Sequence, residues 1–313
     1  MISVVIPTYN RAKDLSRCLN ALNLQLRKPD EIVLVVRDTD IETIRLIKKF
    51  NSKININIVY IKEHGQVAAL NKGIRNAKGD IVSITDDDTE PLPDWLERIE
   101  GHFKRDLSIG GVGGRDWVFH GQHKEIGNKK IVGKIQWFGR VIGNHHLGYG
   151  EAREVDVLKG ANMSYRMTAI KGLSFNTNLK GSGAQVYNDM DFSLSVKKNG
   201  WKLMYDPAVA VNHYPGVRSD EDKRNLFNSE AFYNAVHNET YILHNNFKKI
   251  NRCIYFVWSL FIGTTANPGL LQFIRYFPKE GKISYTKLIT SYKARYSGLK
   301  TLKSVKKNIS TPL

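Results

Sequence analysis

The sequence predicts an α/β fold, in which a mostly parallel central sheet carries flanking helices and precedes a helical, basic C-terminal extension. Two observations predict it. Over the first 85 residues, short apolar runs alternate with segments of helical spacing, which is the pattern of right-handed βαβ units. Beyond residue 220 this alternation stops, and lysines and arginines accumulate toward the end of the chain.

The first expected element is a buried strand over Ile2–Ile6, an apolar run that Pro7 is expected to end. The leucines of Ala12–Leu26 recur at helical spacing, which predicts a helix. The alternation continues with strands expected at Glu31–Val36, Ile54–Ile61 and Asp80–Ile84, and with helices expected at Ile41–Phe50 and Gln66–Ala77. Ligands of such sheets bind beyond the carboxyl ends of the strands, where this chain has mostly polar turns.

The pattern changes after Pro93. Helices are expected at Asp94–Lys104 and Asn188–Asn199, and strands at Gly110–Phe119, Val155–Leu158, Lys202–Tyr205 and Ala208–Val211. Residues 120–153 show no period, which predicts a long loop or a small subdomain. Core packing is the expected role of Trp117, Trp137 and Tyr149, with stacking on a sugar as the alternative.

A long polar helix is expected from Asp220 to about Lys249. From Cys253 to Ile274 no charged residue occurs, although Gly263 and Pro268 interrupt the apolar stretch. A membrane-spanning helix, an interfacial segment and a buried helix pair all remain open for it. The tail that follows carries many lysines and arginines and a single acid, Glu280, so we expect it to lie on anionic lipid.

The charge balance points to an anionic partner. Lys and Arg total 47 against 30 Asp and Glu, which gives a net charge of +17. A nucleotide or an anionic membrane surface fits this charge. Nucleic acid is not expected, because no zinc-ligand spacing or RNA-binding aromatic motif is present. The two cysteines lie far apart and indicate reduced thiols, and no signal peptide is expected, so a cytoplasmic location is predicted.

Three consecutive carboxylates follow the fourth predicted strand, at Asp86–Asp88. Their mutual repulsion needs compensation, and Mg²⁺ or Mn²⁺, which prefer oxygen ligands and substrate phosphates, would provide it. The alternative is an acidic turn that caps the helix after Pro93, although Asp94 suffices for that. The run therefore predicts a metal and phosphate site.

Several segments together resemble family 2 glycosyltransferases, inverting enzymes of the GT-A fold. They are spread over residues 2–215 in the order of the family and comprise Val4–Arg11, the aspartate run with Pro91–Leu96, Gly160–Arg166, Asn188–Phe192, Gly200–Trp201 and Tyr205–Pro207. One such segment would be weak evidence, whereas the ordered set is specific.

The resemblance implies a role for each matching residue. The residues implied in nucleotide binding are Pro7, Thr8, Tyr9, Asp38, Asn71, Asp86 and Asp87. Among these, Asp38 would bond the base. Arg37 stands where the family often has an acid, and Leu70 where it often has an arginine. These differences leave open which nucleotide base the site recognises. Asp88 would ligate the metal directly, and His213 would complete its shell, with a hydrogen-bonded structural histidine as the alternative for His213.

The resemblance makes Asp189 the general base, because an attacking hydroxyl must lose its proton as the new bond forms. Helix capping is the alternative role for Asp189. Asp191, two residues on, is expected to anchor a loop. Lys159, Arg166 and Arg218 lie near the motifs and could contact phosphates, although each is more often a surface cation.

These observations predict an inverting glycosyltransferase that moves one sugar from a nucleoside-diphosphate sugar, a UDP-sugar above all, to a glycan or lipid-linked acceptor of cell-surface polysaccharide synthesis. The expected domains are 1–219, with a nucleotide-sugar half at 1–105 and an acceptor half at 106–219, and a membrane-associating extension at 220–313. The expected location is peripheral, on the inner face of the plasma membrane. A nucleotidyltransferase is disfavoured because the N-terminus has no glycine-rich phosphate loop, and a processive synthase because no Gln-x-x-Arg-Trp element occurs.

Overall fold

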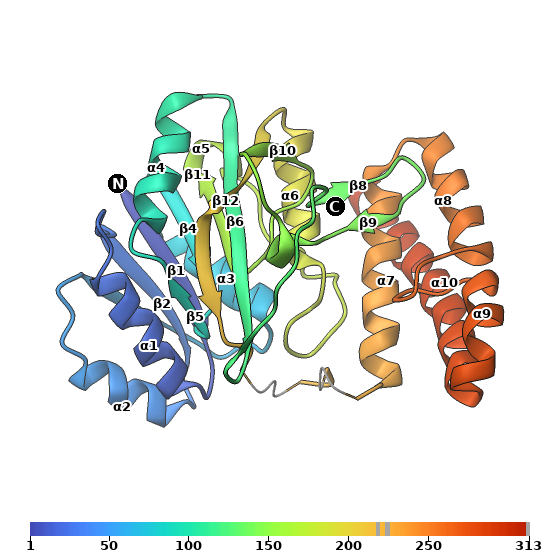
Figure 1. Ribbon diagram of the computed structural model, residues 1–313, viewed down its shortest axis with the longest axis horizontal. Helices are drawn as coiled ribbons and strands as arrows, with labels where there is room; N and C mark the ends of the chain where they lie inside the picture. Colours follow the sequence, from blue (N-terminus) through green and yellow to red (C-terminus); the bar gives the residue numbers. More distant parts are fainter. Residues whose placement is uncertain (217–219, 223–225, 311–313) are drawn as a thin grey trace. The chain divides into compact units, whose positions relative to one another are not determined.

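The computed structural model describes residues 1–216, 220–222 and 226–310, with side chains described as far as residue 307 (Figure 1). Two compact units divide the chain. The N-terminal unit comprises Met1–Lys134, Ile142–Asn176 and Asn188–Val217, and the C-terminal unit comprises Ile135–Val141, Thr177–Tyr187 and Arg218–Leu313. Two internal segments thus group with the C-terminal helices, which no sequence pattern indicated.

The N-terminal unit is built on one large sheet with the strand order β10-β12-β6-β11-β4-β1-β2-β3. Its first half consists of β1 (Ile2–Thr8), β2 (Glu31–Arg37), β3 (Ile56–Ile61) and β4 (Ile81–Thr85), all mutually parallel. Helices α1 (Ala12–Asn23), α2 (Ile41–Lys49) and α3 (Gln66–Asn76) connect them. Pro7 does not end the first strand, because it still pairs with Val35 of β2.

Helices cover both faces of this sheet, which is why its strands are apolar at nearly every position. Val4 and Ile6 of β1 face a core that includes residues of α1 and α4 (Trp95–Arg105). Val5, on the opposite face of the same strand, packs in a core with residues of α3 and α6 (Asn188–Lys198). The predicted mostly parallel α/β fold is confirmed.

The second half of the sheet mixes strand directions: β12 (Lys202–His213) runs parallel to β6 (Ile109–His120), and β11 (Asn162–Arg166) runs antiparallel to both β4 and β6. The short strands β5 (Thr89–Pro91), β7 (His123–Lys124) and β10 (Arg153–Val155) pair antiparallel with their neighbours. The two short strands expected between residues 202 and 211 are one strand, β12, with an irregularity between Asp206 and Val211. The strand expected at Val155–Leu158 is shorter and starts two residues earlier, so only Val155 lies in both. Short elements fill the rest of residues 120–170: β8 (Lys134–Ile135), β9 (Val141–Ile142), η1 (His145–Leu147) and α5 (Met167–Ile170).

The C-terminal unit contains α7 (Ser229–Asn246), α8 (Lys249–Phe261), α9 (Leu270–Glu280) and α10 (Lys282–Ser310), drawn in orange to red in Figure 1. Asn228 caps α7, because its side chain accepts from the N–H groups of Glu230 and Ala231. The long polar helix expected from Asp220 to about Lys249 begins only at Ser229, and its second half is buried, with α10 packed against it. Among the described residues, no helix is both long and apolar enough to cross a bilayer.

Candidate active site

Strand pairing brings His213 to the aspartate run. Strand β5 follows the run directly and pairs antiparallel with the end of β12, so that Thr89 stands opposite His213. The pairing continues beyond the strands, because the N–H of Tyr214 donates to the carbonyl of Asp88 over 2.9 Å. Residues that are distant in the chain are therefore fixed side by side by backbone hydrogen bonds.

Asp86, Asp88 and His213 form the cluster of potential metal ligands. One ligand atom from each lies within 4.8 Å of the other two. His213 Nε2 and Asp88 Oδ1 are 3.3 Å apart, and both atoms are buried without a hydrogen-bond partner. Two ligands of one Mg²⁺, each about 2.1 Å from the ion at right angles, would be separated by about 3 Å. Oxygen and imidazole donors, two of them otherwise unsatisfied, thus fit a divalent cation.

The cluster is strongly coupled by charge. Burial opposes ionisation of His213, yet the carboxylates of Asp116 and Asp88 outweigh it and raise the imidazole pKa to about 9. Burial likewise opposes ionisation of Asp88, while His213 and Arg11 together hold its pKa below the usual range. Burial and the charge of Asp88 raise the pKa of Asp86. A bound divalent cation would replace the proton of the His213 imidazolium as the positive charge that compensates the carboxylates.

Asp116, on β6, is a member of the site that sequence reasoning missed. It is fully buried, and its Oδ2 lies 3.5 Å from His213 Nδ1, on the opposite side of the ring from Asp88. Lys159 donates to the same carboxylate. Burial opposes ionisation of Asp116, but Lys159 and His213 lower its pKa. A charged residue within an expected buried strand was the available signal, because such a charge needs a partner.

Arg11 is the second residue that was missed. Its guanidinium bonds Asp87 Oδ1 at 3.0 Å and Asp88 Oδ2 at 3.1 Å. The hydroxyl of Thr8 also donates to Asp87, over 2.8 Å, and burial raises the pKa of that carboxyl to about 7. Thr8 and Arg11 thus anchor the aspartate run to the first strand, and the N–H of Gly216 adds a bond to Asp88 of 2.9 Å.

The residues expected to bind the nucleotide differ in their surroundings. Tyr9 is 39% exposed beyond β1, with Arg37 over its ring at 5.1 Å, and Asp38 is exposed beyond β2. Asn71 is buried instead, and its amide exchanges two hydrogen bonds, of 2.7 and 2.9 Å, with the backbone of Phe175. A direct contact of Asn71 with a nucleotide stays a prediction. In the structure, the Asn71 side chain fixes the backbone of Phe175.

Asp189 lies in the first turn of α6 and accepts a 3.0 Å hydrogen bond from the N–H of Gly160. The turn that contains Gly160 is held against the end of β4, because the hydroxyl of Thr85 donates to the carbonyl of Ala161 over 2.8 Å. Lys159, in the same turn, reaches Asp116. A chain of contacts therefore links Asp189 to the metal-ligand cluster through this turn.

The remaining candidates have other partners. Asp191 accepts from the amide of Asn176 over 2.8 Å, which anchors that segment as expected. Arg166 donates to the carbonyls of Ile109 and Phe103. Arg218 lies outside the described residues. Core packing was wrong for Trp137, which is 64% exposed, and for Tyr149, which is 37% exposed.

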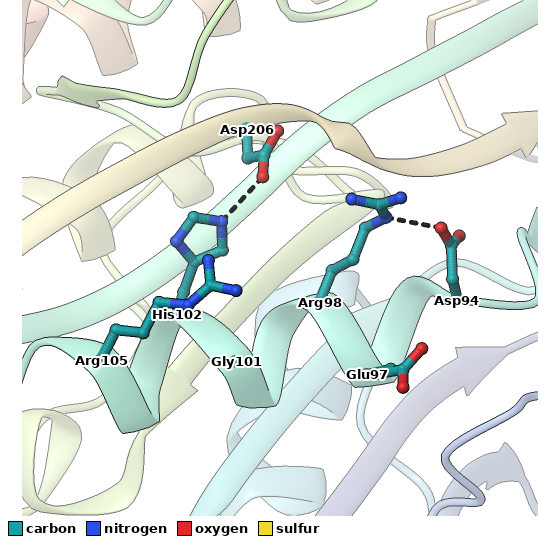
Figure 2. A pocket seen from close by; sticks show the side chains of 7 residues that line it. All are labelled: Asp94, Glu97, Arg98, Gly101, His102, Arg105 and Asp206. Carbon is teal, nitrogen blue, oxygen red and sulfur yellow. Dashed lines mark hydrogen bonds and ion pairs between the residues drawn. The ribbon is translucent and has the colours of Figure 1, made fainter.

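A separate polar cavity of about 350 Å³ lies on α4 and β12. Figure 2 shows His102 of α4 bonded to Asp206 of β12, over 2.8 Å, and Arg98 of α4 paired with Asp94, which directly precedes that helix. None of the predicted site residues lines this cavity. Four of its charged or titratable groups are already paired with one another, as Arg98–Asp94 and His102–Asp206.

A family model described as "Glycosyl transferase family 2" matches residues 3–171, more than half of the chain. The chain belongs to this family. The predicted family and the predicted enzyme class, a glycosyltransferase, are confirmed. The matched segment includes the aspartate run and Asp116 but ends before Asp189 and His213.

Two relatives illustrate the range of the family. A glucosyl-dolichyl phosphate glucuronosyltransferase of Haloferax volcanii is 25% identical over 223 residues, which are 68% of this chain and 68% of that protein. A chondroitin synthase of Escherichia coli is 36% identical over 140 residues, 43% of this chain and only 20% of that protein. The chain thus matches a small part of some relatives and two thirds of others.

Solved structures of GT-A transferases share the fold. S. aureus TarS in complex with UDP-GlcNAc has a TM-score of 0.60 at 16% identity, over 98% of this chain and 92% of that one. The mannosyltransferase PcManGT of Pyrobaculum calidifontis, solved with GDP-Man and Mn²⁺, has a TM-score of 0.58 at 16% identity, over 99% and 87%. Identities this low bear on the fold alone.

Proposed function

We propose that this protein is an inverting glycosyltransferase that moves one sugar from a nucleoside-diphosphate sugar to an acceptor hydroxyl. The observation that carries the proposal is the ligand cluster of Asp86, Asp88 and His213 at the carboxyl edge of the sheet, in which the buried His213 Nε2 and Asp88 Oδ1 atoms face each other at 3.3 Å. The solved structures of the same fold that hold UDP-GlcNAc, or GDP-Man and Mn²⁺, support the donor class.

Asp88 and His213 would hold Mg²⁺ or Mn²⁺, together with Asp86. When bound, the cation supplies Lewis-acid stabilisation of the diphosphate as it leaves. Asp87 has a different role, because Arg11 and Thr8 already engage it: it fixes the run to β1. Tyr9 and Asp38, exposed at the ends of β1 and β2, would receive the nucleoside, with a UDP-sugar as the favoured donor.

Asp189 would act as the general base. The hydrogen bond from the N–H of Gly160 positions the Asp189 carboxylate, which would accept the proton of the attacking hydroxyl. A single carboxylate suffices, because direct displacement needs no acid at the leaving group when charge stabilises the diphosphate. Displacement from the opposite face inverts the anomeric carbon.

The acceptor is proposed to be a lipid-linked glycan. The relative from Haloferax volcanii carries a dolichyl phosphate in its name, and the basic composition of the chain suits a phosphate-bearing acceptor. Addition of a single sugar is proposed because the Gln-x-x-Arg-Trp element of processive synthases does not occur in the sequence.

A thermal-shift screen of nucleotide sugars with Mn²⁺ or Mg²⁺ tests the proposal and identifies the donor. We expect one donor class to raise the melting temperature only with metal, and Asp88→Asn to remove this effect. Asp94→Asn is the matched control, since Asp94 follows the same run but pairs with Arg98. A donor shift that persists in Asp88→Asn, or the absence of any nucleotide-sugar shift in the wild type, would overturn the assignment.

A further inference from the structure

Helices α8 and α9 expose a row of large apolar side chains. Eight of them are between 37% and 69% exposed, and we call them the α8–α9 apolar face: Ile250, Phe256, Val257, Phe261, Leu270, Leu271, Ile274 and Phe277. Contiguous exposed apolar surface of this kind is rare on a protein that has no partner for it.

The exposed residues recur at helical spacing, so each helix has one outer apolar side. The inner side of α9 packs on α10: the ring of Phe273 meets Tyr285 at 6.4 Å, and Ser284 donates to the carbonyl of Phe273 over 3.4 Å. On α8, Tyr255 and Ser259 are buried on the inner side. The two helices are therefore amphipathic, with one side packed against the protein and the other side exposed and apolar.

A rigid turn joins the two outer sides. Gly263 and Pro268 form a bridge across the turn, and the buried guanidinium of Arg295 donates to the carbonyls of Asn267 and Pro268 over 3.0 and 3.2 Å. Phe261 ends α8 and Leu270 begins α9, so both lie at this junction. The turn brings the ends of the two apolar rows together.

Exposed cations border the face. Lys248 and Lys249 precede Ile250 at the start of α8, and Arg275, Lys279 and Lys282 lie along and just beyond α9. Helix α8 contains no acidic residue, and the one acid of α9, Glu280, is paired with Lys287 at 2.7 Å. The surroundings of the face are thus uniformly positive among the described residues.

We propose that the α8–α9 apolar face docks on the surface of a lipid bilayer that contains anionic lipids. An amphipathic helix pair with basic borders places its apolar side chains at the level of the acyl boundary and its cations at the headgroups. A second copy of this chain is a poorer occupant, because a two-fold contact through this face would bring the same cations together. This inference is independent of the sugar transfer itself.

The chain provides its own probe for this docking. Cys253 is exposed on α8, three residues after Ile250 and three before Phe256, whereas Cys18 is buried. We would label Cys253 of the full chain with an environment-sensitive fluorophore. Vesicles of phosphatidylcholine, with and without about one third phosphatidylglycerol, would then be titrated in, with flotation of the unlabelled protein as a second readout.

We expect a blue shift with the anionic vesicles, weaker at high salt and absent with phosphatidylcholine alone. Leu271→Gln/Ile274→Gln should weaken binding about ten-fold or more, while Leu107→Gln/Ile126→Gln, an exposed apolar pair of the N-terminal unit, should not. Lys279→Gln/Lys282→Gln should weaken binding roughly five-fold per cation, and Lys171→Gln/Lys198→Gln serves as the control of equal charge.

Three outcomes would overturn the proposal. They are no blue shift with anionic vesicles, equal losses in a test pair and its control pair, and a dimer in sedimentation equilibrium that Leu271→Gln/Ile274→Gln dissociates. Melting temperatures of all variants verify folding, which exposed substitutions should leave intact.

Discussion

Replacing Asp116 by Asn should weaken metal binding although Asp116 is not itself a ligand. Its carboxylate lies between Lys159 and the Nδ1 edge of His213, so it orients the ring with Nε2 toward Asp88. An asparagine keeps the shape and removes the charge. The imidazole then loses the anionic acceptor that fixes its tautomer and orientation, since the amide can present its NH₂ group to Nδ1 instead of its oxygen.

The magnitude follows from what such partners contribute in metal sites. Loss of a residue that orients a ligand costs about 10–100-fold in metal affinity, which is about 1.4–2.7 kcal/mol. A second effect has the opposite sign. Asp116 helps to raise the His213 pKa to about 9, so at pH 7 the metal must displace a proton. The variant lowers that pKa and therefore lowers the number of protons released per metal bound.

Calorimetric titration with Mn²⁺ at pH 7, in buffers of different ionisation enthalpy, measures affinity and proton release together. The matched control is Asp206→Asn, because Asp206 is also bonded to a histidine, His102, yet lies in the separate cavity of Figure 2. Wild-type affinity and proton release in Asp116→Asn, combined with loss of both in His213→Ala, would refute the orienting role.

Four further outcomes are expected. Asp189→Asn should bind the donor normally in calorimetry while turnover falls about 100-fold or more, and equal loss of both would favour a structural role. Asn71→Ala should lower the free energy of unfolding by about 3 kcal/mol in urea titrations, because two buried backbone groups lose their partners. Gly114→Ala should destabilise by about 3 kcal/mol, since its Cβ would lie 1.7 Å from a carbonyl oxygen, whereas Gly101→Ala in open space on α4 should stabilise by about 0.5–1 kcal/mol. With EDTA present, the raised His213 pKa stabilises the folded state by at most about 3 kcal/mol. This contribution to the free energy of unfolding is complete below pH 6.5 and is lost as the pH rises through about 9. His213→Gln should flatten this pH dependence.

The order of strands and helices was predictable over the first 85 residues because the signals are local. Strands buried on both faces must be continuously apolar, and Leu15, Leu19 and Leu22 mark one side of a helix whatever surrounds it. The misjudged elements are those that depend on distant contacts. Helix α7 appears polar in sequence, yet Asn238 is buried because it bonds the backbone of Lys180.

The sequence alone determined the fold class, the family and the presence of an acidic site at the end of the fourth strand. Local patterning sufficed for the fold class and the acidic site, since each depends on residues close together in the chain, and the order of short motifs along the chain sufficed for the family. The tertiary structure decided which residues meet there. His213 reaches Asp88 only because β12 pairs with β5, and Asp116 reaches His213 only because β12 also pairs with β6. Strand pairing joins residues that no local pattern relates. The family resemblance had implied His213, but the contacts of Asp116 and Arg11 with the site became known only from the structure.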